Sequence, residues 1–294
     1  MPSANTHLPA RRVPGRRTPI QPQPPGLTQL ARALMGACLL GGPVLVGLPA
    51  QAQTTAAALP RGLQVVQGQA QLATQGAQMT VRNSPGAILN WQSFSIGAGA
   101  GVYFDQASAA SKVLNRVTGN DPSQILGSLA SNGQVWLLNP HGVLFGAGAR
   151  VDVAGLVAST LRLGDSDFLA GRYRFAADAG STAFVRNEGD LQSSFGGQIV
   201  LLGSQVHNSG SVSAPGGNVS LAAATSVELV DTGLPNLAVR VDVPAGEVLN
   251  LGRLMAAGGK VDVHGAIVNQ AGLVQASSLG RDALGEVVLR ASDT

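Results

Sequence analysis

Short apolar runs separated by Gly, Asn, Ser and Pro follow one another along the chain from residue 62 onward. Within many runs hydrophobic and polar residues alternate, as in LQVVQGQAQLATQ, and this period of two is typical of β-strands. Two segments show a weak helical period instead, residues 166–176 (SDFLAGRYRFA) and 123–130 (SQILGSLA), and we expect each to form a short turn or one helical loop. The pattern predicts an all-β chain with many tight corners.

The second half of the chain repeats two motifs at intervals of about 20 residues. Pairs of glycines open similar segments at Gly196, Gly216 and Gly258, with the last interval about two steps long. In phase with them, apolar runs end in Asn, or in one case Asp, followed by Gly; these corner residues are Asn187, Asn208, Asp231, Asn250 and Asn269. Two strands and two corners in each unit of this length predict a parallel β-solenoid, with regular coils over residues 185–290.

The physics of a solenoid accounts for these residue types. Strands of one coil hydrogen-bond to their equivalents roughly 4.8 Å away, and small aliphatic side chains fill the narrow interior. Asn or Asp at a corner hydrogen-bonds the neighbouring backbone, and Gly two residues later is expected to supply a positive φ. We expect the equivalent Asn side chains to stack as a hydrogen-bonded ladder, so the five corner residues are assigned a structural role.

The first half is less repetitive and contains most of the large aromatic residues. Residues 83–160 hold Trp91, Phe94, Tyr103, Phe104, Trp136 and Phe145. A solenoid must cover the open end of its first coil, because unpaired backbone and an apolar core would otherwise be exposed. We therefore expect this segment to form an N-terminal cap and the first coils, with the aromatic side chains filling the wider end.

The tetrapeptide Asn139, Pro140, His141 and Gly142 separates two apolar runs, VWLL and VLFG. It fits a type I turn, with Asn at the first position, Pro at the second and Gly at the fourth. The consecutive apolar residues on either side are those of strands covered on both faces. We expect a sharp corner between two buried strands, and a His141 side chain that is solvated or hydrogen-bonded rather than catalytic.

Charge and composition limit the possible functions. Of the 294 residues 45% are hydrophobic but only 4% are aromatic, so the core is built mainly from Val, Leu and Ala. The formal net charge of +3 includes five arginines before position 53, where no acidic residue occurs. The rest of the chain is slightly acidic, which removes the main support for a nucleic-acid partner.

Residues 1–52 are expected to be an export signal with an extended n-region. An arginine-rich start precedes an uncharged stretch, and Ala50 and Ala52 form the small-x-small pattern that predicts cleavage after Ala52. The apolar stretch is too short and too interrupted for a stable membrane span. A later start at Met35 is the alternative. Cleavage would remove Cys38, the only cysteine, and leave residues 53–294 without a disulfide or a thiol nucleophile.

Enzymatic alternatives find little support in the sequence. A polysaccharide lyase or hydrolase is the main one, because β-helices often carry sugar chemistry, and such enzymes need converging carboxylates. The near pairs, Asp165 with Asp167 and Glu188 with Asp190, fall in expected surface loops without a nearby His or Lys. No serine-hydrolase, phosphate-loop, calcium or zinc motif occurs. We predict no catalytic residues, no metal and no cofactor, and keep a polysaccharide-active β-helical enzyme as the alternative.

Three segments closely resemble the N-terminal secretion domain of filamentous-haemagglutinin-like exoproteins, the two-partner secretion (TPS) family of Gram-negative bacteria. They are ILNWQSFSIGAGAGVYFDQ, LNRVTGNDPSQILGSLASNGQVWLLNPHGVLFGAGARVDVAGLVAST and DFLAGRYRF. The resemblance covers about residues 60–290 and implies a right-handed parallel β-helix with an N-terminal cap and extra-helical strands. The family's Asn-Pro-Asn-Gly tetrapeptide falls on Asn139, Pro140, His141 and Gly142, with His141 as the departure. A second family tetrapeptide, Asn-Pro-Asn-Leu, has no intact copy here.

The resemblance also implies a function in export. The domain would pass through the periplasm, bind the POTRA-type periplasmic domains of an outer-membrane β-barrel transporter, and reach the cell surface or the medium as part of an adhesin. A host receptor or glycan is a possible second partner; related exoproteins also carry cytolysins, haem-acquisition proteins or toxins. We expect exposed edges near residues 62–82 and 136–146 to contact the transporter, with strand addition as a plausible mode. The chain ends in mid-pattern, as would a fragment, a shortened paralogue or a domain without cargo.

Overall fold

The computed structural model describes residues 58–231, 237–276 and 286–291. The expected export signal over residues 1–52, its cleavage residues Ala50 and Ala52, and Cys38 lie outside the described residues. The described residues belong to one compact unit, residues 52–294. In these ranges no helix has the length and apolar character that a membrane span requires.

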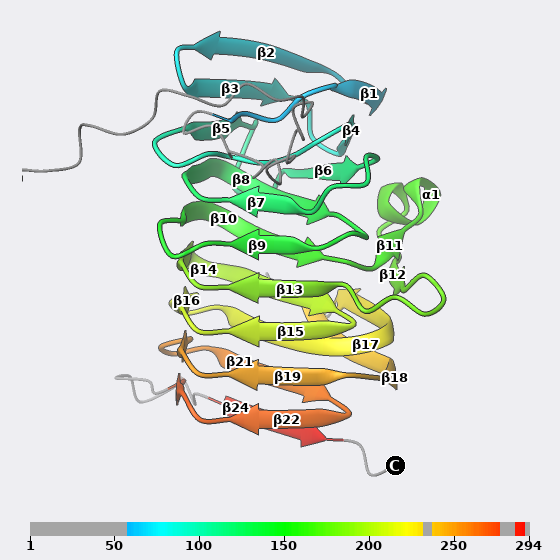
Figure 1. Cartoon of the computed structure of the whole chain (residues 1–294), viewed down its shortest axis with the longest axis vertical. Coiled ribbons are helices and arrows are strands. Elements are labelled where there is room, and N and C mark those ends of the chain that lie inside the picture. The colour runs from blue at the N-terminus through cyan, green and yellow to red at the C-terminus, as the bar shows by residue number, and fades with distance from the viewer. Residues whose placement is uncertain (1–57, 232–236, 277–285, 292–294) are drawn as a thin grey trace, which may run out of the picture. The chain divides into compact units, whose positions relative to one another are not determined.

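The unit is a stack of three-sided coils (Figure 1). The first face consists of β3 (Gln78–Asn83), β5 (Gly101–Asp105), β16 (Ser211–Ser213), β20 (Arg253–Met255), β23 (Leu273–Gln275) and the first halves of β8 (Ser128–Leu138), β10 (Arg150–Ser159) and β14 (Asp190–Gly203). The second face consists of the second halves of those three strands with β4 (Ala87–Trp91), β6 (Lys112–Val117), β17 (Asn218–Asp231), β21 (Lys260–Gly265) and β24 (Glu286–Ala291). The third face consists of β7 (Ser123–Ile125), β9 (Val143–Phe145), β13 (Phe184–Asn187), β15 (Gln205–Asn208), β19 (Glu247–Asn250) and β22 (Ile267–Gln270).

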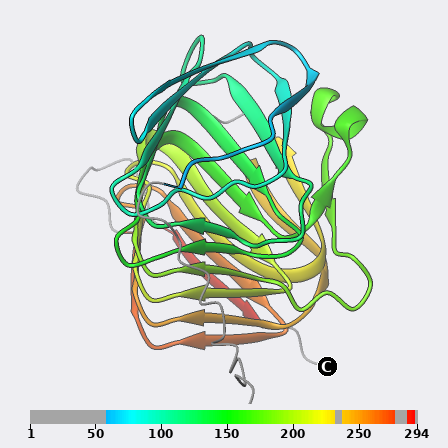
Figure 2. The same ribbon diagram turned by 45° about the horizontal axis from the view of Figure 1, so that its top comes forward.

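Each strand pairs in parallel with its equivalents in the neighbouring coils. Leu156 in β10, for example, lies opposite Val135 in β8 and Ile199 in β14. Figure 2 shows the same coils tilted so that the N-terminal end of the stack comes forward. The predicted all-β parallel β-helix is confirmed.

The coil interior is filled by columns of aliphatic side chains. On the third face Val185, Val206 and Val248 occupy equivalent positions, and all three are fully buried. The aromatic residues Trp91, Phe94, Phe104 and Phe145 join this interior cluster, as expected for the first coils. Two aromatic residues differ from that expectation: Tyr103 is 41% exposed, and Trp136 belongs to a second cluster outside the coils.

This second cluster covers the outer side of the second face. A four-stranded antiparallel sheet is formed by β11 (Arg162–Leu163), β12 (Tyr173–Ala176), the far half of β17, and β18 (Leu237–Pro244), and it is accompanied by the helix α1 (Asp165–Leu169). The Trp136 ring packs against Phe168, Tyr173 and Phe175, with ring centroids 4.7–6.1 Å apart. Both faces of β8 are therefore buried here, which explains the consecutive apolar residues VWLL.

The N-terminal end of the stack is formed by two antiparallel strands that precede residue 83. Strand β1 (Gln64–Gln67) runs antiparallel to β4, and β2 (Ala70–Gln75) runs antiparallel to β3. Together they form the N-terminal end of the stack (Figure 1). Residues from β3 onward already belong to the parallel ladder, because β3 pairs with β5 and β4 pairs with β6.

At the corner between the first and second faces, each of the two paired glycines is required for a different reason. The first glycine of the pair, Gly216, has a φ of +65°, which favours residues without a Cβ. The second, Gly217, lies so close to the coil before it that a Cβ would be 1.7 Å from the carbonyl oxygen of Gly197. The repeated GG motif thus satisfies one conformational and one packing requirement.

Candidate functional site

Residues 139–142 form a hydrogen-bonded turn at the corner between the second and third faces. The Gly142 backbone N–H donates to the Asn139 carbonyl oxygen at 3.1 Å, and the His141 N–H donates to Asn139 Oδ1 at 2.9 Å. Gly142 has a φ of +123°, where a side chain would be strained. The turn links β8 to β9, as the sequence predicts.

The side chain of Asn139 joins this turn to the coil before it. The side chain is fully buried, and its Nδ2 donates to the carbonyl oxygen of Asp121 and to Ser123 Oγ, both at 3.0 Å. Its backbone N–H donates to the Ser159 carbonyl oxygen of the following coil at 2.9 Å. Asn139 therefore fixes the relative positions of three successive coils at one corner.

His141 projects outward from the turn. It is exposed and interacts electrostatically with Asp178 on the loop after β12. The two hydrogen bonds that Arg162 donates to Asp178, at 2.5 and 2.6 Å, lower the pKa of that carboxyl, and His141 adds a smaller effect in the same direction. The Asp178 carboxylate is thus already engaged by a guanidinium, and nothing in this arrangement prepares His141 for acid–base chemistry.

Both carboxylates of one candidate pair, Asp165 and Asp167, are engaged in ion pairs. Asp165 accepts a hydrogen bond from Arg116 at 2.6 Å, and Asp167 pairs with Arg172 at 2.9 Å. Both ion pairs hold the helix α1 in place. Within the described ranges, no three His, Cys, Asp or Glu side chains gather closely enough to hold a metal ion.

Three of the five expected corner residues stack at the corner between the third and first faces. Asn187 Nδ2 donates to Asn208 Oδ1 at 2.8 Å, and Asn208 Nδ2 donates to Asn250 Oδ1 at 2.7 Å. All three side chains are buried. Asn187 Oδ1 also accepts the N–H of Gly189 at 3.1 Å, so each coil closes on its own backbone and on the next coil.

The structure corrects the other two positions. Gln270, not Asn269, continues the ladder by accepting from Asn250 Nδ2 at 2.9 Å; Asn269 is one residue out of register and points to solvent, where it donates to Glu247. Asp231 lies outside the coils, paired with Leu237 in the β17–β18 hairpin. Asn208 and Asn250 are direct neighbours, so the long interval between them is one coil enlarged by a hairpin.

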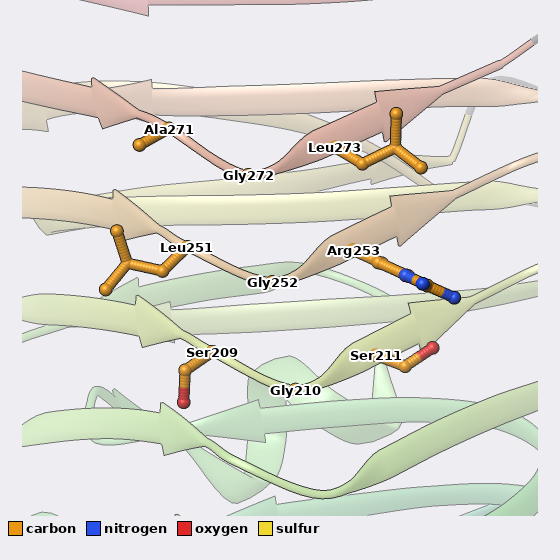
Figure 3. A pocket seen from close by; sticks show the side chains of 9 residues that line it. All are labelled: Ser209, Gly210, Ser211, Leu251, Gly252, Arg253, Ala271, Gly272 and Leu273. Carbon is orange, nitrogen blue, oxygen red and sulfur yellow. The ribbon is translucent and has the colours of Figure 1, made fainter. Parts of the chain in front are cut away.

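The glycines after the ladder have a different role from the one expected. None of Gly189, Gly210, Gly252 and Gly272 has a positive φ. A Cβ at Gly210 would instead lie 2.1 Å from the Gly189 carbonyl oxygen, so this column requires glycine for close coil stacking. Gly210, Gly252 and Gly272 form the bottom of an open groove of about 510 Å³. Ser209, Leu251 and Ala271 lie on one side of it, and Ser211, Arg253 and Leu273 lie on the other (Figure 3).

Sequence reasoning missed an open pocket next to the Asn139 corner. It has a volume of about 540 Å³ and is lined by Arg61, Gln92, Ser93, Gly119, Asn120 and Asp121. The Asp121 carbonyl that Asn139 holds belongs to its wall. No sequence pattern marks this pocket, because its two sides come together only when the first coils stack.

The N-terminal edge of the stack is open and uncharged. In the described part of the chain, β1 pairs only with β4 and β2 pairs only with β3. Val65, Val66 and Leu72 are 43–45% exposed. Natural edge strands are usually protected by charges, proline or bulges; β1 has an irregular register between Val65 and Gln67, but no charged residue or proline occurs over residues 62–81. This edge is therefore suited to accept another strand.

Comparisons with known proteins agree with this architecture. The family described as "TPS secretion domain" matches residues 56–294. The crystal structure of the HMW1 secretion domain from Haemophilus influenzae is 36% identical with a TM-score of 0.74, over 78% of this chain and 62% of that one.

Two curated relatives, both named heme/hemopexin-binding protein and both from Haemophilus influenzae, match part of the chain. One is 47% identical over 103 residues, which is 35% of this chain and 11% of the relative. The other is 38% identical over 120 residues, which is 40% of this chain and 12% of the relative. The matched segments thus span only a small part of these longer proteins.

Proposed function

The chain belongs to the TPS secretion domain family, and on this premise we propose that POTRA-type periplasmic domains of its outer-membrane β-barrel transporter recognise the N-terminal end of the β-helix. TPS exoproteins are exported through the periplasm and are secreted or exposed at the cell surface. The proposed role of this domain is to bring the exoprotein to its transporter. We also propose, from the likeness to filamentous-haemagglutinin-type exoproteins, that the exported protein contributes to an adhesin with a host receptor or glycan as its second partner.

The observation that carries the proposal is the open, uncharged edge formed by β1 and β2. Strand addition gives affinity through main-chain hydrogen bonds, and it needs an edge free of charges and proline. The edge lies at the N-terminal end of the stack, beside the pocket whose wall Asn139 holds. We propose that Asn139 acts by keeping this end in the shape that the transporter recognises, rather than by touching the transporter itself.

Export from a Gram-negative host tests the proposal. The chain is expressed with and without its transporter, and the protein in the medium is compared with that retained in the periplasm. We expect Asn139→Ala to abolish export while synthesis continues, because three side-chain hydrogen bonds are lost. Asn269→Ala is the matched control, since that side chain is exposed. Wild-type export without the transporter, or full export of Asn139→Ala, would refute the proposal.

A second variant separates recognition from folding. Val65→Lys places a charge on the edge strand at a residue that is 43% exposed. We expect export to fall while thermal stability stays at the wild-type value. Leu273→Lys, at an equally exposed apolar position in the C-terminal coils, should be exported normally. Normal export of both Val65→Lys and Leu273→Lys would exclude β1 as the contact edge.

A further inference from the structure

The edge strand β1 carries little information about register. Its sequence, Gln-Val-Val-Gln, reads the same in both directions, and all four residues are exposed. Arg61 and Arg82 are the nearest charged residues on either side. Because no charged, aromatic or buried side chain marks a position along β1, the register of a strand added to it is weakly specified. A partner that binds in one position needs a fixed point elsewhere.

The pocket of about 540 Å³ lies at the N-terminal end of this edge. Arg61 continues the antiparallel pairing of β1 with β4: its N–H donates to the Ser93 carbonyl oxygen at 2.9 Å, and the Ser93 N–H donates back at 3.2 Å. Arg61, Ser93 and Asp121 all line the pocket, which therefore lies on the β4 side of Arg61. A strand added to the free side of β1 reaches the pocket where its chain continues past Gln64 and turns toward β4.

Two charges of opposite sign stand in this pocket. Arg61 and Asp121 are both exposed, and within the described residues neither side chain forms an ion pair. Most other ions near this end are paired, as Arg82 is with Asp105. Free charges at the rim of a contact surface act on partner choice and register more than on total affinity.

The wall that carries Asp121 is held from two sides. Asn139 Nδ2 donates to the Asp121 carbonyl oxygen at 3.0 Å, and the Ser123 N–H donates to the Gly142 carbonyl oxygen at 3.0 Å. At the other end of the loop, a Cβ on Gly119 would lie 2.2 Å from the Gln92 carbonyl oxygen, so the loop rests directly on the neighbouring coil. The Asn139 corner thereby holds the Asp121 loop in place at the wall of the pocket.

From this geometry we propose that the pocket fixes the register of the strand that the transporter adds to β1. The partner chain continues from that strand into the pocket, where one of its acidic side chains pairs with Arg61 and one of its basic side chains pairs with Asp121. Asn139 is a positioning residue for this contact, because it holds the Asp121 loop. The inference rests on the proposed function and names the part of the domain that the transporter reads.

Binding of the full chain to the purified periplasmic domains of its transporter tests the inference at low and high salt. We expect Arg61→Gln and Asp121→Asn each to weaken binding about two- to fivefold, as for exposed charges, and to flatten its salt dependence. Arg253→Gln, in the open groove of about 510 Å³ at the C-terminal coils, is the matched control and should bind as the wild type does. Thermal midpoints should be equal in all three variants.

The salt dependence of binding distinguishes a positioning role of Asn139 from a purely structural one. The residue is uncharged, yet Asn139→Ala should flatten the salt dependence of binding as the charge variants do, because Asp121 moves away from its partner. Wild-type salt dependence in the Arg61 and Asp121 variants, or an equal loss in Arg253→Gln, would overturn the inference. If Val65→Lys still blocked export in that case, the proposed function would stand without it.

Discussion

The asparagine ladder predicts a large difference between two asparagines that look alike in the sequence. Asn208 is 1% exposed, accepts from Asn187 at 2.8 Å and donates to Asn250 at 2.7 Å. Asn269 lies on the exposed side of the third face and donates only to Glu247. Replacing each residue by Ala therefore tests whether the buried ladder, rather than the repeat itself, stabilises the coils.

The structure sets the expected size of the effect. In Asn208→Ala the Nδ2 of Asn187 keeps two carbonyl acceptors at 3.3 Å, those of Gly189 and Ser211. The Oδ1 of Asn250 loses the donor that reaches it at 2.7 Å. The variant also loses two long hydrogen bonds from Asn208 Nδ2, to the carbonyl oxygens of Gly210 at 3.4 Å and Arg253 at 3.5 Å. Counting only the two short hydrogen bonds at about 1 kcal/mol each, with about 1–2 kcal/mol for a buried acceptor left unpaired, gives a loss of about 3–4 kcal/mol in the free energy of unfolding. Asn269→Ala should cost less than about 0.5 kcal/mol.

Urea unfolding of the purified chain, followed by far-ultraviolet circular dichroism, measures both variants. Stacked coils can lose cooperativity, so amide hydrogen exchange over residues 205–255 supplies a second, local measure. We expect protection to fall in β15 and β19 for Asn208→Ala alone. If the two variants differed by less than about 0.5 kcal/mol, the ladder would contribute no net stability and the reasoning would fail.

Two further predictions concern the coil corners and the extra-helical sheet. Gly210→Ala should lower the free energy of unfolding by about 2–3 kcal/mol in the same urea assay, because its Cβ would lie 2.1 Å from the Gly189 carbonyl oxygen; Gly164→Ala, whose Cβ has no neighbour closer than 3.9 Å, should change it little. Arg162→Gln should raise the pKa of Asp178 in a carboxyl NMR titration. Since the pKa of Asp178 is lowered in the folded state, the pair stabilises the fold above the ordinary Asp pKa, and this contribution disappears as the pH falls through the folded-state value; an unchanged pKa would show that Arg162 is not its cause.

The sequence was sufficient for the fold but not for the positions of all its corners. Hydrophobic alternation and the repeat predicted the β-helix, because coil stacking imposes the same requirement on each turn. The spacing alone misplaced Asp231, since a hairpin that leaves the coil adds about as many residues as another coil would. The prediction also assigned Asn269 rather than Gln270 to the ladder, because it looked for an asparagine at the corner. Strand register, not residue type, determines which side chain points inward, and it places Gln270 next to Asn250.

The turn at Asn139 was predictable from the sequence, but the neighbouring pocket was not. The turn at Asn139 follows from local residue preferences, which act over four residues. The pocket follows from pairing between Arg61 and Ser93 and from contact between Gln92 and Gly119, which are separated along the chain and carry no shared pattern. Such a site can be found only once the register of the first coils is known.

The placement of the insertions explains why the N-terminal end stays accessible. Residues 161–183 and the β17–β18 hairpin both leave the coil at the second face and join the hydrophobic cluster that contains Trp136. Within the described residues, neither insertion pairs with a strand of the first or third face. Chain added at a corner leaves the coil-to-coil ladder intact, so Asn139, the pocket and β1 stay in one packed unit. A partner that binds this end contacts the same surface whatever sequence the later coils have. A secretion domain shared by different exoproteins requires such a constant surface.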